Sequence, residues 1–374
     1  MNILYITTIG VTMGFFKSLI RALLDAGHTV DIATNENGGE TPIPICYREW
    51  GCKVYPISCS RSPLNKGNLA AIREIREIVQ KGNYDIVHCH TPIAAACTRL
   101  ACRKLRKTGV KVIYTAHGFH FYTGAPLKNW LLYYPVEWLC ARWTDVLITI
   151  NKEDYERAKK HMHAKCVEYV PGVGIDTKRF MNASVDRAAK RREIGVPEDA
   201  TLLMSVGELN ENKNHSVVIK ALAKINDKNV HYAIAGVGPL KDALEALAKS
   251  LGVGEQLHLL GYRPDVPELY KAADICVFPS IREGLPVAVM EGMAAGLPFV
   301  AADNRGTRDL LTDGENALIC RYDDADGFAA GVENLCKTEH LRCSMSKDNR
   351  KNAVLLDSNN INDRVCEIYF SGVA

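Results

Sequence analysis

The most constraining feature of this chain is a regular alternation of short apolar segments with longer amphipathic ones. The apolar segments are rich in Val and Ile, which is typical of buried strands. In the first half of the chain they lie at 3–7, 30–33, 54–57, 86–88, 112–115 and 146–150. Amphipathic stretches such as 15–24 and 69–80 separate several of them with helical periodicity. Because strands joined through helices run parallel, the alternation predicts a parallel sheet with helices on both faces.

A second series of the same kind follows Val170-Pro171-Gly172. Its apolar segments lie at 202–206, 231–235, 256–260, 275–278 and 299–302, and its helical segments at 216–225, 240–251 and 266–273. The length of 374 residues also favours two domains. We therefore predict one domain over residues 1–170 and another over 171–360, with a C-terminal helix in 361–374 packed back on the first. Two such sheets facing a central cleft would bind ligands at the carboxyl ends of their strands.

Composition excludes several classes of protein. The chain is 47% hydrophobic and 24% charged, as in an ordinary globular protein, and has no apolar run near the ~20 residues that cross a bilayer. Its 13 cysteines lack metal-ligand spacing, which fits a reducing cytosol.

Residues 1–6 resemble a first strand rather than a signal peptide. His88-Cys89-His90 has no second ligand cluster, so we expect no metal site there.

The net charge of +3 conceals a difference between the two halves of the chain. Residues 1–180 hold 24 Lys and Arg against 15 Asp and Glu, a balance of +9, and the remainder holds 22 against 28, a balance of −6. Part of the surplus is a basic cluster of Arg99, Arg103, Lys104, Arg106, Lys107 and Lys111, which aromatic residues follow. This pattern suits the headgroup region of a membrane. The alternatives are a solvated charged face beside an aromatic core, or a surface for nucleic acid.

The region 279–291 holds the pattern with the most chemical content. A strand-like segment leads into a Pro/Gly loop, and Pro286 suits the first turn of the helix that follows. Glu283 lies just before this helix and Glu291 lies inside it. Carboxylates accept hydrogen bonds from sugar hydroxyls, and the free amides expected at 285–289 would bind phosphate. The pattern suits a ligand that is part sugar and part phosphate, although the helix dipole alone also favours Glu at such a position.

The same stretch carries a family resemblance. The sequence from Glu283 to Pro298 resembles the E-x₇-E signature of retaining glycosyltransferases of family 4. Further similar positions are Gly207, Lys213, Gly236-Val237-Gly238-Pro239, Gly261-Tyr262, Gly306 and Asp313-Gly314-Glu315-Asn316, and in the first half His90-Thr91-Pro92 and Thr115-Ala116-His117-Gly118. The resemblance covers essentially the whole chain. It implies an α/β GT-B fold of two Rossmann-like, doubly wound domains, with a nucleotide sugar held by the second and an acceptor mainly by the first.

Finer features, such as His117-Gly118-Phe119-His120-Phe121, resemble the branch that builds bacterial exopolysaccharide, capsule and the O-antigen of lipopolysaccharide. The resemblance implies that His117, Lys213 and Glu283 are catalytic. The donor-binding residues that it implies are Gly10, Gly14, Gly207, Lys213, Gly236, Gly238, Tyr262, Arg263, Glu283, Gly284, Leu285, Pro286, Val287 and Glu291. Where the family usually has Arg after the glycine at 207, this chain has Glu208, and Arg263 or Arg282 would have to compensate.

The implied reaction is a retaining transfer of a hexose or N-acetylhexosamine from a UDP-sugar to a hydroxyl of a polyprenyl-diphosphate-linked glycan. Lys213 and the helix-start amides would stabilise the departing diphosphate. The two glutamates would hold hydroxyls rather than act as the carboxylate pair of a retaining hydrolase.

We expect no cofactor, no divalent metal and no nucleic acid as partner. We also expect a cytoplasmic location with contact to the inner face of the cytoplasmic membrane. The alternatives are a GT-B-like nucleotide-sugar epimerase and a non-catalytic UDP-sugar-binding protein. A nicotinamide dehydrogenase is disfavoured, because no strand leads into G-x-G-x-x-G.

Overall fold

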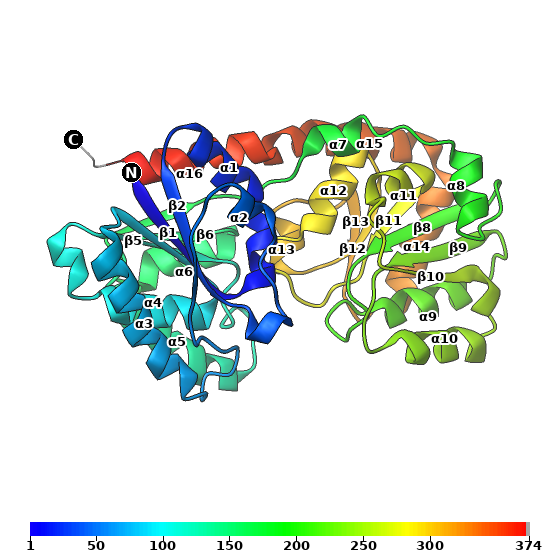
Figure 1. Cartoon of the computed structure of the whole chain (residues 1–374). Coiled ribbons are helices and arrows are strands. Elements are labelled where there is room, and N and C mark those ends of the chain that lie inside the picture. The colour runs from blue at the N-terminus through cyan, green and yellow to red at the C-terminus, as the bar shows by residue number, and fades with distance from the viewer. Residues whose placement is uncertain (372–374) are drawn as a thin grey trace. The chain divides into compact units, whose positions relative to one another are not determined.

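The computed structural model describes residues 1–371, which form two compact units (Figure 1). Unit 1 comprises residues 1–173 and the described part of the segment that begins at Ser358, and unit 2 comprises residues 174–357. The chain therefore passes from unit 1 to unit 2 and back again. The C-terminal helix was predicted within 361–374, and residues 372–374 lie outside the described residues.

Unit 1 is built on a parallel seven-stranded sheet in the order β3-β2-β1-β4-β5-β6-β7. The strands are β1 (Asn2–Ile9), β2 (Thr29–Asn35), β3 (Val54–Pro56), β4 (Ile86–His90), β5 (Lys111–Ala116), β6 (Val146–Thr149) and β7 (Cys166–Tyr169). The order starts at a central strand and winds outward in both directions, which is a doubly wound arrangement. Ile3 of β1 pairs with Val30 on one side and with Ile86 on the other. The carboxyl ends of β1 and β4 therefore lie side by side.

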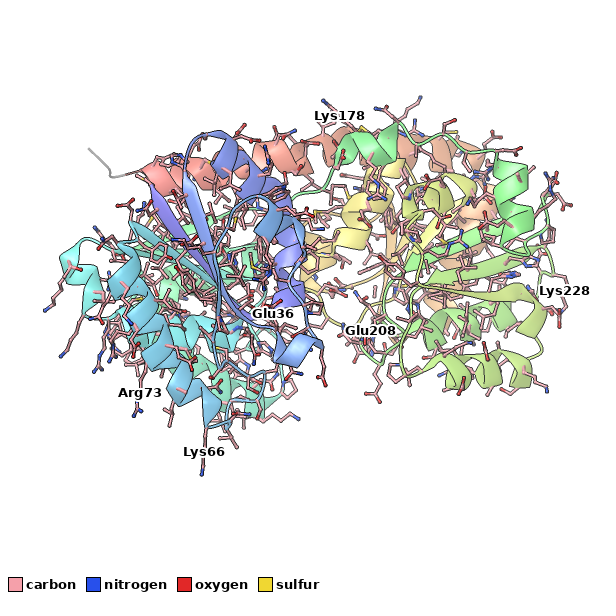
Figure 2. All side chains as sticks on the ribbon, in the orientation of Figure 1. Glu36, Lys66, Arg73, Lys178, Glu208 and Lys228 are labelled. Carbon is pink, nitrogen blue, oxygen red and sulfur yellow. The ribbon has the colours of Figure 1, made fainter. Side chains whose placement is uncertain are left out.

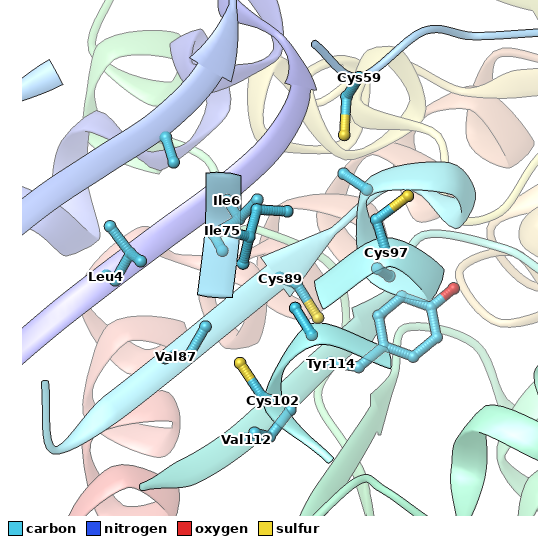
Figure 3. Packing of buried hydrophobic residues seen from close by; sticks show 14 of the residues in the cluster. Leu4, Ile6, Cys59, Ile75, Val87, Cys89, Cys97, Cys102, Val112 and Tyr114 are labelled. Atoms are coloured by element: carbon cyan, nitrogen blue, oxygen red, sulfur yellow. The ribbon is translucent and has the colours of Figure 1, made fainter. Parts of the chain in front are cut away.

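Helices cover both faces of this sheet (Figure 1). The helices of unit 1 are α1 (Lys17–Asp25), α2 (Cys46–Glu49), α3 (Gly67–Gly82), α4 (Pro92–Cys102), α5 (Leu127–Ala141), α6 (Lys152–His161) and α16 (Ser358–Phe370), with 3-10 segments at Gly10–Phe16 (η1), Asn37–Gly39 and Leu105–Thr108. Leu4 of β1 belongs to the buried cluster that includes residues of α3 and α4 (Figure 3). Its neighbour Tyr5 belongs to a second cluster, with residues of α1 and α16. Successive side chains of β1 thus serve opposite faces of the sheet.

The basic cluster predicted after residue 99 is not one continuous face. Arg99 is fully buried and pairs with Glu137 of α5 at 2.8 Å. Arg106 is engaged with Asp145 at 2.6 Å. The headgroup-binding surface inferred from these charges is therefore wrong for Arg99, because an arginine with no solvent exposure cannot reach a lipid.

Unit 2 repeats the doubly wound arrangement with six parallel strands in the order β10-β9-β8-β11-β12-β13. The strands are β8 (Thr201–Val206), β9 (Val230–Ala235), β10 (Leu257–Gly261), β11 (Ile275–Phe278), β12 (Phe299–Ala302) and β13 (Ala317–Cys320). The helices are α7 (Thr177–Met181), α8 (Arg187–Glu193), α9 (His215–Ile225), α10 (Lys241–Ser250), α11 (Val266–Ala272), α12 (Val287–Ala295), α13 (Arg305–Arg308), α14 (Ala325–Lys337) and α15 (Glu339–Ala353), with 3-10 segments at Gly254–Gln256 and Val354–Leu356. Residues of α9, α10 and α14 form one buried cluster with the sheet. Because β11 pairs with β8, the loops that leave these two strands are neighbours.

These two sheets confirm the predicted α/β architecture of two Rossmann-like, doubly wound units. The sequence pattern does not predict β7 or β13, because both are edge strands whose residues are mostly only partly buried. The amphipathic stretch at 15–24 divides between η1 and α1. Among residues 1–371, no helix combines the length and apolar character needed to span a membrane.

Candidate functional site

The loop that carries Glu283 follows β11 and is held from two sides. The amide of Ile281 donates to the carbonyl of Asn212 at 2.8 Å, and Asn212 Nδ2 donates to the carbonyl of Arg282 at 3.0 Å. From the other side, Arg305 Nε donates to the carbonyl of Glu283 itself at 3.1 Å. The backbone around Glu283 is thus fixed by the loop after β8 and by the start of α13.

Lys213 and Glu283 form an ion pair within this arrangement. Lys213 Nζ lies 2.7 Å from Glu283 Oε1, and the side chains are only 23% and 16% exposed. The Lys213 amide donates to Asn210 Oδ1 at 2.9 Å, which fixes the start of the lysine side chain. Two residues 70 positions apart are therefore brought together, as the neighbouring positions of β8 and β11 require.

The glycines at 207, 236 and 238 allow the loops after β8 and β9 to touch. A Cβ added to Gly236 would lie 1.9 Å from the carbonyl oxygen of Gly207. One added to Gly238 would lie 2.4 Å from the carbonyl oxygen of Leu209. Gly207 lies against the Lys213 side chain, with 3.3 Å between an added Cβ and the lysine Cδ. Close contact between the two loops explains Gly236 and Gly238, and Gly207 packs against the Lys213 side chain.

Helix α12 begins at Val287, one position later than predicted. Pro286 is the residue before the helix, with φ −78° and ψ 115°, and no side chain caps the helix start. Its carbonyl accepts the amide of Val289 at 3.1 Å. The predicted set of free amides therefore loses Val289, while helix geometry leaves the amides of Val287 and Ala288 without intrahelical partners. Leu285 and Gly284 lie in the approach to the helix, where Gly284 O would be 3.0 Å from a Cβ on Gly306.

Glu291 lies in the second turn of α12 in a mostly buried environment. Burial raises the pKa of its carboxyl from 4.5 to about 7, and Arg179 opposes this effect. Among residues 1–371, no hydrogen bond to its carboxylate contributes to this pKa. The carboxylate thus retains its capacity to accept hydrogen bonds from a ligand.

Tyr262 and Arg263, which were predicted to contact the nucleotide base, differ in their surroundings: the tyrosine is exposed and the arginine is paired with carboxylates. Tyr262 is 80% exposed. Arg263 donates to Asp265 Oδ1 at 2.7 Å and also pairs with Glu193 at 2.5 Å. Since its guanidinium is held by two carboxylates, Arg263 is a poor replacement for the arginine that the family usually has at the position of Glu208. Glu208 itself is exposed on the loop after β8 (Figure 2).

In unit 1, His117 follows β5 and contacts a second histidine. His117 Nε2 lies 3.1 Å from His90 Nδ1 at the end of β4. His88 Nε2 lies 2.8 Å from Thr115 Oγ1. Burial lowers the pKa of His117 to about 4 and that of His88 to about 3, and it holds the pKa of His90 well below 6.5. The histidines are therefore neutral at physiological pH.

The two predicted glycines of unit 1 have different surroundings. An added Cβ on Gly10 would lie 2.4 Å from the carbonyl oxygen of Thr41, so packing within unit 1 requires glycine there. Around Gly14, no heavy atom of the described residues, apart from its chain neighbours and helix backbone, lies within 4 Å of such a Cβ. Only Gly10 is thus explained by its contacts.

Sequence reasoning missed the contacts of three residues, two in unit 2 and one in unit 1. Asn212 and Arg305 fix the Glu283 loop, and His90 contacts His117. His90 belongs to His90-Thr91-Pro92, which resembles the family pattern, but its contact with His117 was not predicted. Its position at the end of β4, next to β5, was the available signal, because the residues that end neighbouring parallel strands lie together.

Comparisons with known proteins identify the family. A model described as Glycosyl transferases group 1 matches residues 186–352, and one described as Glycosyltransferase Family 4 matches residues 15–179. EpsD of Bacillus subtilis (strain 168), provisionally named a glycosyltransferase, is 40% identical over 92% of this chain and 89% of its own length. The chain belongs to glycosyltransferase family 4.

Two further proteins resemble this family 4 glycosyltransferase. The UDP-Gal:alpha-D-GlcNAc-diphosphoundecaprenol alpha-1,3-galactosyltransferase of Escherichia coli is 28% identical over 80% of this chain and 78% of its own. The crystal structure of Anabaena Alr3699/HepE in complex with UDP and glucose superposes with a TM-score of 0.82 at 18% identity, over 99% of this chain and 100% of HepE. The fold of the family 4 glycosyltransferase is thus GT-B, as predicted.

Proposed function

We propose that this family 4 glycosyltransferase moves a hexose or N-acetylhexosamine from a UDP-sugar, with retention, to a hydroxyl of a polyprenyl-diphosphate-linked glycan during assembly of a cell-surface polysaccharide. The observation that carries the proposal is the Lys213–Glu283 ion pair, at 2.7 Å, on a loop that leads to the uncapped start of α12. A cation, a carboxylate and two free amides together match a ligand with a diphosphate next to sugar hydroxyls.

Each group has a distinct role in the proposed donor complex. Glu283 accepts hydrogen bonds from hydroxyls of the transferred sugar, and Glu291 accepts them from the ribose. Lys213 leaves its pairing with Glu283 in part and turns toward the diphosphate, with the amides of Val287 and Ala288. Because Lys213 and Glu283 pair with each other, neither partly buried charge lacks a partner of opposite sign.

The proposed chemistry depends on the leaving group. As the bond from the anomeric carbon to the diphosphate oxygen breaks, its electron pair passes to that oxygen, where Lys213 and the amides stabilise the growing charge. The acceptor oxygen attacks the same face of the sugar and passes its proton to the departing diphosphate. Glu283 is not a nucleophile in this scheme, and no divalent metal or other cofactor takes part.

Two relatives support the choice of substrates. The E. coli galactosyltransferase is named for a UDP-sugar donor and a diphosphoundecaprenol-linked acceptor. HepE binds UDP and glucose in its crystal structure. We extend these ligand classes to this chain as part of the proposal, and the transferred sugar is to be identified by experiment.

The exposed face of α5 supports contact with the inner surface of the cytoplasmic membrane. Five large aliphatic side chains of this helix are 43–72% exposed, namely Leu127, Leu131, Leu132, Val136 and Leu139. Lys128 near the start of α5 and Arg142 after its end are exposed basic residues. An apolar helix face flanked by cations suits an anionic lipid surface, where the leucines enter the acyl boundary and the cations meet headgroups.

A panel of UDP-sugars incubated with polyprenyl-diphosphate-linked acceptors tests the reaction, with the anomer of the product read by NMR. We expect Glu291→Ala to weaken donor binding and Lys213→Ala mainly to slow turnover, whereas Lys249→Ala, on the exposed side of α10, should do neither. Wild-type rates in both site variants at limiting donor would overturn the site assignment. Release of UDP without any acceptor would favour an epimerase, and donor binding without turnover a binding protein.

Vesicle flotation tests the membrane contact separately. The wild-type protein should float with vesicles containing phosphatidylglycerol more than with pure phosphatidylcholine, and Leu131→Gln/Leu132→Gln should remain in the soluble fraction. Leu355→Gln, which alters another exposed leucine, is the matched control. Equal flotation of the double variant and the wild type would show that α5 is not the contact.

A further inference from the structure

The two nitrogens of His90 have different environments. Nδ1 lies 3.1 Å from Nε2 of His117. Nε2 is buried and has no hydrogen-bond partner among the described residues. A neutral imidazole carries one N–H and one lone pair, so its tautomer decides which of these occupies each environment.

The ring of His90 is held in place by its neighbours. Its centroid lies 4.2 Å from that of Phe16 and 4.1 Å from that of His88. Tyr5 stacks on it at 5.4 Å with an interplanar angle of 19°. Because His90 is only 1% exposed, bulk solvent does not reach its ring. The orientation that directs Nδ1 toward His117 is therefore built into the core of unit 1.

Only one proton can lie between the two histidines, because burial keeps both rings neutral. If His117 donated this proton to His90, His90 would carry its own N–H on the buried Nε2, with no acceptor among residues 1–371. If His90 donates, the buried Nε2 is an unpaired acceptor instead. Orphaned buried N–H groups are rarer in proteins than under-satisfied acceptors, so the second arrangement is favoured.

We propose that His90 is a positioning residue that donates its Nδ1–H to His117 Nε2 and thereby holds His117 as the Nδ1–H tautomer. His117 Nδ1 has no hydrogen-bond partner among residues 1–371, and His117 is only partly buried. His117 then offers a ligand an N–H donor and not a lone pair. Its role toward a sugar hydroxyl, which rests on the proposed function, is to donate a hydrogen bond, and it cannot serve as the general base of the transfer.

Selective ¹⁵N labelling of histidine in the full-length protein tests the tautomer without any substrate. Two-bond ¹H–¹⁵N correlation should show His117 protonated at Nδ1, with its signals assigned from His117→Gln. His90→Asn keeps a donor near the Nδ1 position and should preserve this tautomer, whereas His90→Leu should shift His117 toward the Nε2–H form. A wild-type His117 protonated at Nε2, or no response to His90→Leu, would overturn the proposal.

Transfer kinetics then distinguish a role of His90 in positioning His117 from a role in the stability of the fold. With the melting temperatures of both variants measured, His90→Asn should keep transfer within about threefold of the wild type and His90→Leu should lose tenfold or more in kcat. Equal losses in the two variants would indicate a packing role only. If the tautomer is as proposed but His117→Gln transfers sugar normally, the inference about His90 holds and the assignment of His117 to the site fails.

Discussion

At the residue scale, the proposed role of Glu291 would make donor binding depend on pH. Burial raises the pKa of its carboxyl in the folded protein to about 7, from 4.5. A carboxyl with a raised folded-state pKa contributes stability that is fully present below about pH 4.5 and is lost as the pH rises through about 7. A ribose hydroxyl prefers the ionised carboxylate as its acceptor. Donor affinity and this contribution to stability should therefore change with pH in opposite directions.

We expect UDP to bind about 3- to 10-fold more tightly at pH 8 than at pH 6, and Glu291→Gln to remove most of this dependence. Isothermal titration calorimetry on the wild type, on Glu291→Gln and on the exposed control Glu255→Gln measures the effect and cancels the titration of UDP itself. A pH dependence that is identical in the wild type and Glu291→Gln would contradict the role of Glu291.

Gly236 and Gly14 give a second prediction, because their surroundings differ. Gly236→Ala places a Cβ 1.9 Å from a backbone oxygen, and Gly14→Ala places one in open space. We expect the first to lower the free energy of unfolding by more than about 2 kcal/mol, and the second to change it by less than about 0.5 kcal/mol. Urea unfolding followed by circular dichroism compares the two variants, and similar effects would show that close packing does not explain Gly236.

The residues of the candidate site could be predicted from the sequence, but the residues that they contact could not. Glu283, Glu291 and Lys213 stand out by motif, but the ion pair of Lys213 depends on the pairing of β8 with β11. The lack of free space beside Gly236 arises from the backbone of Gly207, and Arg263 pairs with Glu193, which is 70 positions away. Periodicity and composition carry no information about such contacts.

At the scale of elements, α4 and α5 are joined through a buried ion pair. Arg99 Nη2 lies 2.8 Å from Glu137 Oε2, and its guanidinium stacks 4.2 Å from the centre of the Tyr114 ring. Tyr114 donates to the other carboxylate oxygen at 3.1 Å. From the sequence alone, a single arginine in an apolar helix is expected to be exposed to solvent. Its partner lies on another helix, which is why the burial of Arg99 could not be predicted.

Removing one member of this ion pair should destabilise the folded protein more than replacing both members with apolar residues. Glu137→Ala leaves a buried, unpaired guanidinium and should destabilise the protein by about 3–5 kcal/mol, whereas Arg99→Met/Glu137→Leu should be less destabilising. Asp25→Ala, which breaks the exposed pair with Arg21, should lower stability by less than about 1 kcal/mol. Chemical denaturation measures the free energy of unfolding of all three variants. A double variant that is less stable than Glu137→Ala would refute the expected order.

Most elements could be predicted because their apolar segments are buried. Strands such as β8 (Thr201–Val206) have an uninterrupted buried run that stands out from the flanking turns. The edge strands β7 and β13 lack this run, since one face or one side is open. The start of α12 was shifted by one residue because Pro286 satisfies the φ of a helix while its ψ remains extended.

At the scale of the whole molecule, unit 1 is completed by the C-terminal helix α16. This helix packs on α1 and buries Ile361, Val365 and Ile368. The Tyr369 hydroxyl lies 2.5 Å from both the Tyr5 hydroxyl and His88 Nδ1. Both ends of the chain segment 1–370 thus contribute to one core.

A chain that ends at Asp357 should therefore lose the fold of unit 1 and keep that of unit 2. The missing helix leaves apolar surface of α1 and the sheet open to water, at about 1.5–3 kcal/mol for each large buried side chain. Hydrogen exchange with mass spectrometry should show rapid exchange in β1 and β4 but protection in β8 and β11. Arg364→Ala, which removes only exposed ion pairs of α16, is the control and should leave exchange unchanged. Protected β1 and β4 in the shortened chain would contradict the prediction.

The chain runs from unit 1 to unit 2 and back to unit 1, so the parts of unit 1 are synthesised at different times. Residues 1–173 are made before unit 2, and the residues of α16 are made after it. At about 5–20 residues per second, roughly 10–40 s separate the two, which is the time needed to synthesise unit 2. During synthesis the nascent first unit therefore waits with the α1 side of its core uncovered, a state in which a chaperone that binds apolar surface has its best opportunity to act.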